Sequence, residues 1–197
     1  MSGALNGGFF GVAASNYAKI AEVDNTGTVA TILFSNIPQN YKHLIIVGSL
    51  FNTWTGGCYQ VDMWWNQGSS TPSSGSDYKY AKNYTYNTTA TYAADHMGGT
   101  TKFSSVAYSA YGGDRNTAYG DGSGFEMIIP RYSSSGHDKG FASEWGAQSY
   151  SEGNKTFWGY SGGNKHNTAP ITEICFYSGV NFGPDSKITI YGLIEAA

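Results

Sequence analysis

The chain has 197 residues, of which 16% are aromatic and only 13% are charged, and its formal net charge at pH 7 is -3. A disordered chain would be richer in charge and poorer in aromatic residues. The sequence has no block of Lys and Arg such as nucleic-acid-binding proteins carry. It also has no apolar run near the roughly 20 residues of a membrane-spanning helix. We therefore expect a globular protein with no nucleic-acid partner and no membrane segment.

Residues 1–16 form a small-residue, Gly-rich segment that contains four larger apolar side chains, Leu5, Phe9, Phe10 and Val12. Ordering such a segment costs roughly 1–2 kcal/mol per residue in backbone entropy, while burying one aromatic side chain returns only about 1.5–3 kcal/mol. The segment is therefore predicted to be an arm that binds a neighbouring chain, ahead of a single domain at 17–197. The start of the chain has no basic region and no long apolar core, so we expect no secretion signal and assembly in a cytoplasm.

Residues 13–22 are compatible with one or two helical turns, and strand patterns follow. Residues 28–34 alternate between two faces, whereas 43–50 are apolar on both faces and indicate a central strand. Residues 58–65 form the next predicted strand. The tyrosine-rich stretch 78–92 is expected to form one or two strands, with Tyr84 and Tyr86 at a contact with a partner chain.

The second half continues the same pattern. Residues 93–100 are predicted to turn, and strands are expected at 101–111, 125–131, 139–150 and 156–160, with a turn at Gly162-Gly163-Asn164. The closing segment, 171–194, reads as strand, connection and strand, either a hairpin or a two-strand crossing. About eight to ten short strands bounded by turns predict an all-β fold, an antiparallel, jelly-roll-like β-sandwich with little helix.

The residues suggest no catalytic, cofactor or metal site. The four histidines, His43, His96, His137 and His166, lack the spacing of a paired metal site, and Gly120–Gly124 lacks the periodic ligands of a calcium loop. Glutamates that a glycosidase would use, such as Glu126, Glu144, Glu152 and Glu173, cannot be paired without a fold. Cys58 and Cys175 are expected to be reduced thiols, with Cys175 buried.

The aromatic residues leave two interpretations open. Aromatic faces beside Asn, Asp and Ser side chains are what a carbohydrate-binding surface uses, but the same residues also serve as core and subunit-contact packing. The candidates for stacking on sugars are the tyrosines and the five tryptophans, Trp54, Trp64, Trp65, Trp145 and Trp158.

Three stretches together resemble a known family. Residues 34–49 match the pattern F-x-x-I-P-x-x-Y-x-H-L-x-I-x-x-S of small tailed-phage virion proteins, 125–139 resemble their middle strand and turn, and 171–194 resemble their C-terminus. The resemblance covers about a third of the chain and carries no catalytic residue. It implies a virion location, and such proteins occur as head decoration proteins and as tail or fibre components. The short chain and its apolar arm favour a capsid decoration (cement) protein, which we expect to be a homotrimer bound to the major capsid protein. The alternative is a tail-fibre or receptor-binding module that recognises host surface carbohydrate.

Overall fold

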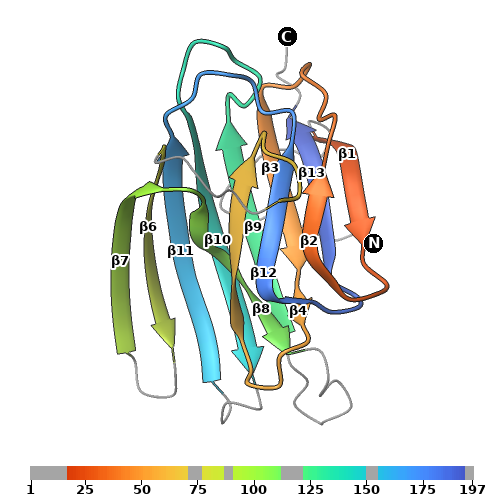
Figure 1. Ribbon diagram of the computed structural model, residues 1–197, viewed down its shortest axis with the longest axis vertical. Coiled ribbons are helices and arrows are strands. Elements are labelled where there is room, and N and C mark those ends of the chain that lie inside the picture. Colours follow the sequence, from red (N-terminus) through yellow and green to blue (C-terminus); the bar gives the residue numbers. More distant parts are fainter. Residues whose placement is uncertain (1–16, 71–76, 87–90, 112–121, 150–154, 194–197) are drawn as a thin grey trace, which may run out of the picture.

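The computed structural model describes residues 17–70, 77–86, 91–111, 122–149 and 155–193, which form two β-sheets (Figure 1). The strands are β1 (Tyr17–Asp24), β2 (Val29–Phe34), β3 (His43–Ser49), β4 (Phe51–Asn52), β5 (Tyr59–Trp65), β6 (Tyr78–Tyr86), β7 (Thr91–Thr100), β8 (Phe103–Tyr111), β9 (Gly122–Pro130), β10 (Lys139–Ser149), β11 (Lys155–Lys165), β12 (Ile174–Phe182) and β13 (Lys187–Leu193). The predicted arm at 1–16 lies outside the described residues.

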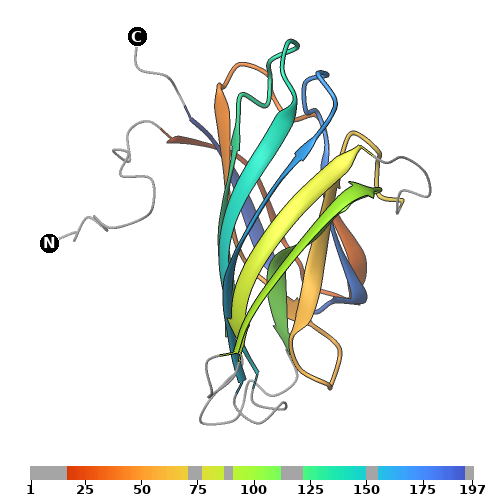
Figure 2. The ribbon, with the colours of Figure 1, turned by 90° about the vertical axis from the view of Figure 1, so that its left-hand side faces the viewer.

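The sheets differ in size. The larger has the order β1-β13-β3-β9-β10-β11-β6-β7, and the smaller contains β2, β12, β4, β8 and β5, with β12 also paired to β5. Among the described residues, the strands pair antiparallel except for the short parallel contact between β4 and β8. Figure 2 shows the two layers facing each other, with β6 and β7 at one edge of the large sheet. The predicted all-β sandwich is confirmed, and no helix of the described residues is long and apolar enough to cross a membrane.

The core lies between the inner faces of the two sheets. Ile46, Ile174 and Ile190 have no exposed surface, and together they represent both sheets. The prediction that β3 is a central strand is confirmed, because Leu44, Ile45 and Ile46 are all buried although they alternate between faces. Cys58 and Cys175 are both buried and form no disulfide, and the predicted burial of Cys175 is confirmed.

The closing segment crosses between the sheets. β12 lies in the small sheet between β2 and β5, whereas β13 lies in the large sheet between β1 and β3. Of the two alternatives left open by the sequence, the two-strand crossing is correct. The last two strands therefore contribute to the centre of both layers.

Three sequence predictions were wrong. Residues 17–22 form the strand β1 and not a helical turn, because Ala21 and Val23 pair with the buried Ile190 and Ile188 of β13. Residues 93–100 belong to β7 and not to a turn, since they pair along the edge of β6. β11 continues through the glycines that were predicted to turn.

Gly163 is the residue that explains the continuation of β11. A Cβ at this position would lie 2.5 Å from the carbonyl oxygen of Lys79 and 2.9 Å from the ring of Phe103. The glycine thus allows β6 and the aromatic core to approach the strand closely, and marks a packing constraint where the sequence suggested a turn.

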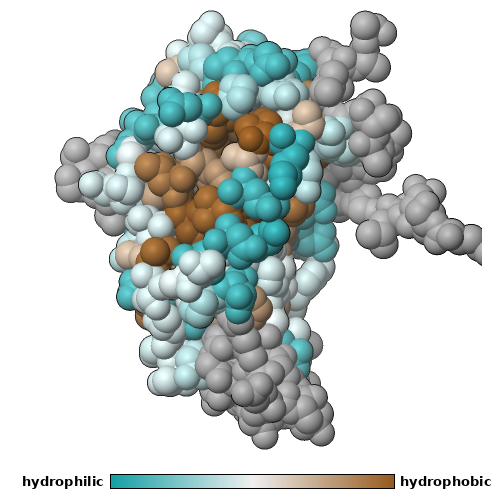
Figure 3. All heavy atoms as spheres, turned by 90° about the vertical axis from the view of Figure 1, so that its right-hand side faces the viewer, coloured by the Kyte–Doolittle hydropathy of each residue, from teal (hydrophilic) through white to brown (hydrophobic). Residues whose placement is uncertain are grey.

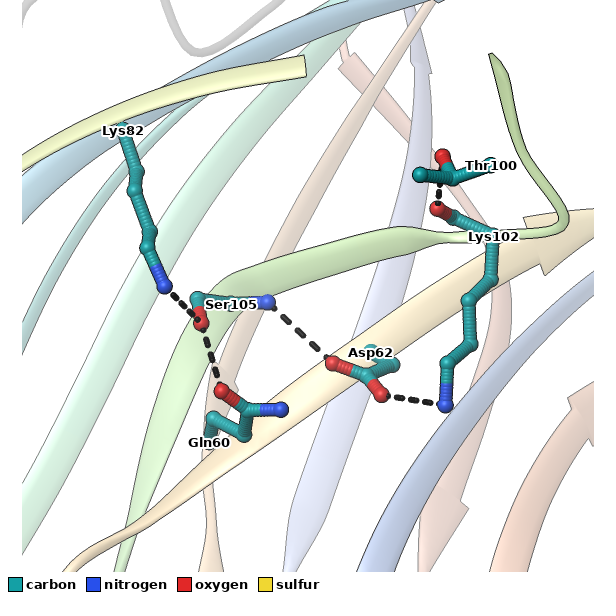
Figure 4. Close-up of polar contacts among 6 residues, drawn as sticks. All are labelled: Gln60, Asp62, Lys82, Thr100, Lys102 and Ser105. Atoms are coloured by element: carbon teal, nitrogen blue, oxygen red, sulfur yellow. Dashed lines mark hydrogen bonds and ion pairs between the residues drawn. The ribbon is translucent and has the colours of Figure 1, made fainter. Parts of the chain in front are cut away.

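A polar network joins the sheets beside this aromatic core (Figure 4). The carboxylate of the buried Asp62 lies 2.7 Å from Lys102 Nζ and accepts a hydrogen bond from the Ser105 backbone N–H. The Ser105 hydroxyl donates to Gln60 and accepts from Lys82 of β6. Because the buried carboxylate has both an ion pair and a hydrogen bond, its burial is compensated. Strands β5 and β8 of the small sheet are thereby tied to β6 of the large one.

Two glycine substitutions test the close approach at β11. Gly163→Ala is expected to lower the free energy of unfolding by roughly 1–3 kcal/mol, the usual cost of overpacking. The neighbouring Gly162→Ala is the matched control, because its Cβ would meet nothing closer than the Phe141 carbonyl oxygen at 3.4 Å. Urea denaturation of both variants measures the difference, and equal stabilities would contradict the packing account.

Candidate functional site

Two large aromatic side chains stand exposed on the outer face of the large sheet. Trp158 and Tyr160 of β11 are 44% and 40% exposed, and their rings meet edge to face with centroids 4.7 Å apart. They are two residues apart on one strand and therefore project from the same face. Between them, Gly159 is buried on the inner side. We call Trp158 and Tyr160 the aromatic platform.

The structure separates the five tryptophans into two groups. Trp64, Trp65 and Trp145 are at most 1% exposed and serve the core, so for them the packing interpretation is correct. Trp54 and Trp158 are exposed. Trp54 lies in the connection between β4 and β5, where its ring packs against Tyr59. Of these two, Trp158 is the one that stands on a sheet face beside a second exposed aromatic ring.

Small residues surround the aromatic platform on the neighbouring strands. Gly146 of β10 is paired with Trp158, while Ala142 of β10 and Ala81 of β6 are both paired with Gly162. A shallow hollow of about 490 Å³ adjoins this area and is lined by Lys79, Tyr80, Ala81, Met97, Gly98, Gly162, Gly163 and Asn164. The side chains around the exposed rings are therefore small, which leaves the ring faces accessible to a ligand.

Polar groups continue from the platform across the sheet in one row. Tyr160 is paired with Glu144 of β10 and with Asn83 of β6, and Glu144 is paired in turn with Glu126 of β9. Burial and the neighbouring Glu144, which hydrogen-bonds the phenol, raise the pKa of Tyr160. Burial and the charge of Glu144 also raise the pKa of Glu126. The platform is thus flanked by hydrogen-bond acceptors on one side and by an amide on the other.

The residues predicted to bind partners are only partly placed. Leu5, Phe9, Phe10 and Val12 lie outside the described residues, and for Tyr86 only the backbone of β6 is described. Tyr84 is half-buried and faces the inside of the sandwich, with its ring 6.4 Å from that of Tyr108 and 6.3 Å from that of Trp145. The proposed role of these residues in partner contacts stays a prediction.

The remaining ionisable groups of the described residues offer no candidate metal centre. In the described segments, no three His, Cys, Asp or Glu side chains are placed to hold a metal ion. His166 and Asp138 form a pair at 3.0 Å, but both are exposed. Burial raises the pKa of the Cys175 thiol to about 12, which keeps it protonated and unreactive at neutral pH.

Sequence reasoning named Trp158 but missed Tyr160 as its companion. The signal was present in Trp158-Gly159-Tyr160, because a strand places the first and third of these residues on one face. The sequence alone did not reveal which face is open, since this depends on the small sheet covering the other side.

No protein-family model matches this chain, and no curated protein matches it. Among solved structures, the chain has a weak similarity to the CBM2 module of the Lactobacillus casei BL23 phage J-1 evolved Dit, with 11% identity and a TM-score of 0.24. The match covers 98% of this chain and 82% of that one. Because a TM-score this low does not establish a common fold, the site is interpreted from its own residues.

The carboxylate pair beside the platform predicts an unusual pH dependence. Because the folded-state pKa of Glu126 is raised above its ordinary value of 4.5, ionisation of this group destabilises the fold at pH 7. Glu126→Gln is therefore expected to raise the free energy of unfolding at pH 7 by about a few tenths of a kcal/mol, the size of one cross-strand like-charge contact.

This gain should diminish as the pH falls through the folded-state pKa, and should disappear below the ordinary value of 4.5, where both states are protonated. Urea denaturation of the wild type and the variant at neutral and acidic pH measures it. A variant that is less stable at pH 7, or a difference independent of pH, would show that the two carboxylates do not repel each other.

Proposed function

We propose that this chain is a non-catalytic module of a tailed-phage particle that binds host surface carbohydrate through the aromatic platform. The observation that carries the proposal is the exposed pair Trp158 and Tyr160 on an open sheet face. Large aromatic side chains are costly to leave in water, and a paired, supported arrangement of them on a surface indicates a contact site.

The arrangement fits a sugar better than a flat apolar partner. The apolar C–H face of a pyranose ring stacks on an aromatic ring, while its hydroxyl groups need hydrogen-bond partners at the rim. Glu144 accepts hydrogen bonds, and Asn83 both donates and accepts them. Both residues are paired with Tyr160 in the sheet, so they are held beside the ring.

The same groups support binding without hydrolysis. Glu126 and Glu144 stand on adjacent strands of one open face. Glycoside hydrolysis requires two carboxyl groups that flank the scissile bond, whereas here both approach a ligand from the same side. We therefore assign them to hydroxyl recognition.

The phage-particle part of the proposal is supported by the resemblance of the three sequence stretches. These stretches supply β3, β9, β12 and β13, which are central strands of the two sheets. The platform lies on β11, between β10 and β6. These three strands lie outside the stretches that resemble the family, apart from Lys139, the first residue of β10. A receptor-binding module can keep the scaffold of its family and carry a binding surface that differs from those of the other members.

The capsid decoration role is the second candidate and stays a prediction from the sequence. The half-buried apolar residues along β1 and β2, described below, favour a protein that is covered by other chains. Quantitative mass spectrometry of purified particles distinguishes the candidates, because a decoration protein follows the copy number of the capsid lattice and a tail module follows the much lower copy number of the tail.

Trp158→Ala is expected to weaken glycan binding by at least about tenfold, since a truncated aromatic anchor commonly costs about 2 kcal/mol or more. The probe is a glycan array that includes bacterial cell-wall polysaccharides, followed by calorimetry on the best ligand. Tyr160→Phe should retain stacking and lose only the hydroxyl contact with Glu144, so its effect should be smaller.

Trp54→Ala provides the matched control, because Trp54 is almost equally exposed at 41% but lies away from the platform. It should leave glycan binding unchanged. Equal losses in the two tryptophan variants, or wild-type binding by Trp158→Ala, would contradict the assignment of the site.

A further inference from the structure

β1 forms an edge of the large sheet. It pairs on one side with β13, and on its other side no strand of the described residues pairs with it. Backbone N–H and C=O groups along such an edge are a template for another strand. The character of the side chains along β1 therefore decides what the edge can accept.

A β-bulge gives β1 an unusual arrangement of charges. The register to β13 shifts between Lys19 and Ala21, so Ile20 is the extra residue. Lys19 and Glu22, three residues apart, would lie on opposite faces of a regular strand. The bulge instead places both on the outer face, where Lys19 Nζ and a Glu22 carboxylate oxygen are 3.3 Å apart.

We propose that two copies of this chain associate by antiparallel pairing of β1 with β1, with Lys19 of each copy opposite Glu22 of the other. The inference goes beyond the proposed function and does not depend on it. The two-fold symmetry produces the charge contact twice, and directly opposed unlike charges stabilise a pair of strands.

The same register matches the two faces of the strand. Tyr17, Lys19, Glu22 and Asp24 are paired with outward residues of β13, while Ala18, Ala21 and Val23 are on the inward side. Away from the bulge, the outward residues of one copy meet outward residues of the other in this register, and inward residues meet inward ones. The opposed residues are Tyr17 with Asp24, Ala18 with Val23, Lys19 with Glu22 and Ile20 with Ala21.

Apolar surface is available on this side of the molecule. Figure 3 looks at the molecule from the right-hand side of Figure 1, where β1 and β2 lie, and shows apolar residues gathered on this face. Ile20, Ala21 and Val23 of β1 and Leu33 of β2 are only partly buried against the core, and Val29 of β2 is 37% exposed. A second copy on the β1 edge covers part of this area.

Charges and bulges on edge strands usually prevent pairing with other chains. In β1 the charges of Lys19 and Glu22 are complementary to those of a second antiparallel copy. They therefore favour pairing with this copy over a strand of different sequence. Because the pairing is two-fold, it closes after two copies. The homotrimer expected for a decoration protein would require a different contact.

Sedimentation equilibrium of the full chain tests the proposal. The wild type is expected at twice the chain mass of 21.1 kDa. Lys19→Glu and Glu22→Lys each create two like-charge contacts, and should raise the dissociation constant at least about tenfold. A wild type that is monomeric at high concentration, or trimeric, would overturn the inference.

Mixing the two charge variants separates the contact between chains from the ion pair within one chain. Each variant has lost the Lys19–Glu22 pair within the chain, and Glu22→Lys has also lost the pair with Lys187 of β13. In the proposed register, however, the two carboxylates of the Lys19→Glu chain face the two ammonium groups of the Glu22→Lys chain. The mixture should therefore form a heterodimer although each variant alone is weakened. If the mixture stays monomeric while the wild type is dimeric, the copies pair elsewhere.

A disulfide cross-link tests the register itself. The double variant Lys19→Cys/Glu22→Cys should form a covalent dimer under mild oxidation, because each new thiol faces its counterpart across the two-fold axis. Within one chain the bulge brings these positions to roughly 7 Å apart, the spacing of their partners Tyr191 and Thr189, which is at the upper limit for a disulfide. A non-reducing gel therefore separates the covalent dimer from an internally bridged monomer by mass. Lys19→Cys alone is the control and should not cross-link, since its own copy is three positions away. Efficient cross-linking of this control would overturn the register.

Discussion

A buried chain of hydrogen bonds between the two sheets is the interaction on which the platform side of the structure depends. The indole N–H of Trp145 donates to the Ser161 hydroxyl at 3.0 Å, and this hydroxyl donates to the backbone carbonyl of Ser105. The backbone N–H of Ser105 then reaches Asp62. Since these groups are buried, each contact also prevents the cost of an unsatisfied polar group.

This internal chain determines the geometry of the external platform. Trp145 lies against Gly159, where a Cβ would come within 2.8 Å of its ring and 2.4 Å of the Asn83 carbonyl oxygen. Gly159 is therefore required for the close packing of β10, β11 and β6. The flanking residues Trp158 and Tyr160 are directed outward from a backbone that the buried indole holds in place, which is the support that a preorganised binding surface needs.

Much of the fold could be predicted from local patterns, and the failures have physical causes. Alternation identified β2, β9 and β13, and the doubly apolar run identified β3 as central. β1 and β7 were missed because they are stabilised mainly by pairing with β13 and β6, and only weakly by their own composition. For β1 the partner strand is also distant in sequence. β11 was interrupted in the prediction because glycines that allow close packing look like glycines that turn a chain. For the site, Trp65 and Trp158 both lie in strands, and only the placement of the opposite sheet, whose Tyr78 contacts Trp65, decides which one is exposed.

The crossing of β12 and β13 between the sheets has a consequence for how the protein is made. One of the two neighbours of β3 is β13, and within the described residues β2 pairs only with β12. Until the ribosome has released these last strands, Leu44 and Ile46 of β3 lack part of their cover, and neither layer is complete. Pairings between distant segments also form slowly. The nascent domain is therefore prone to aggregation until β12 and β13 have left the ribosome, because this one segment completes both layers.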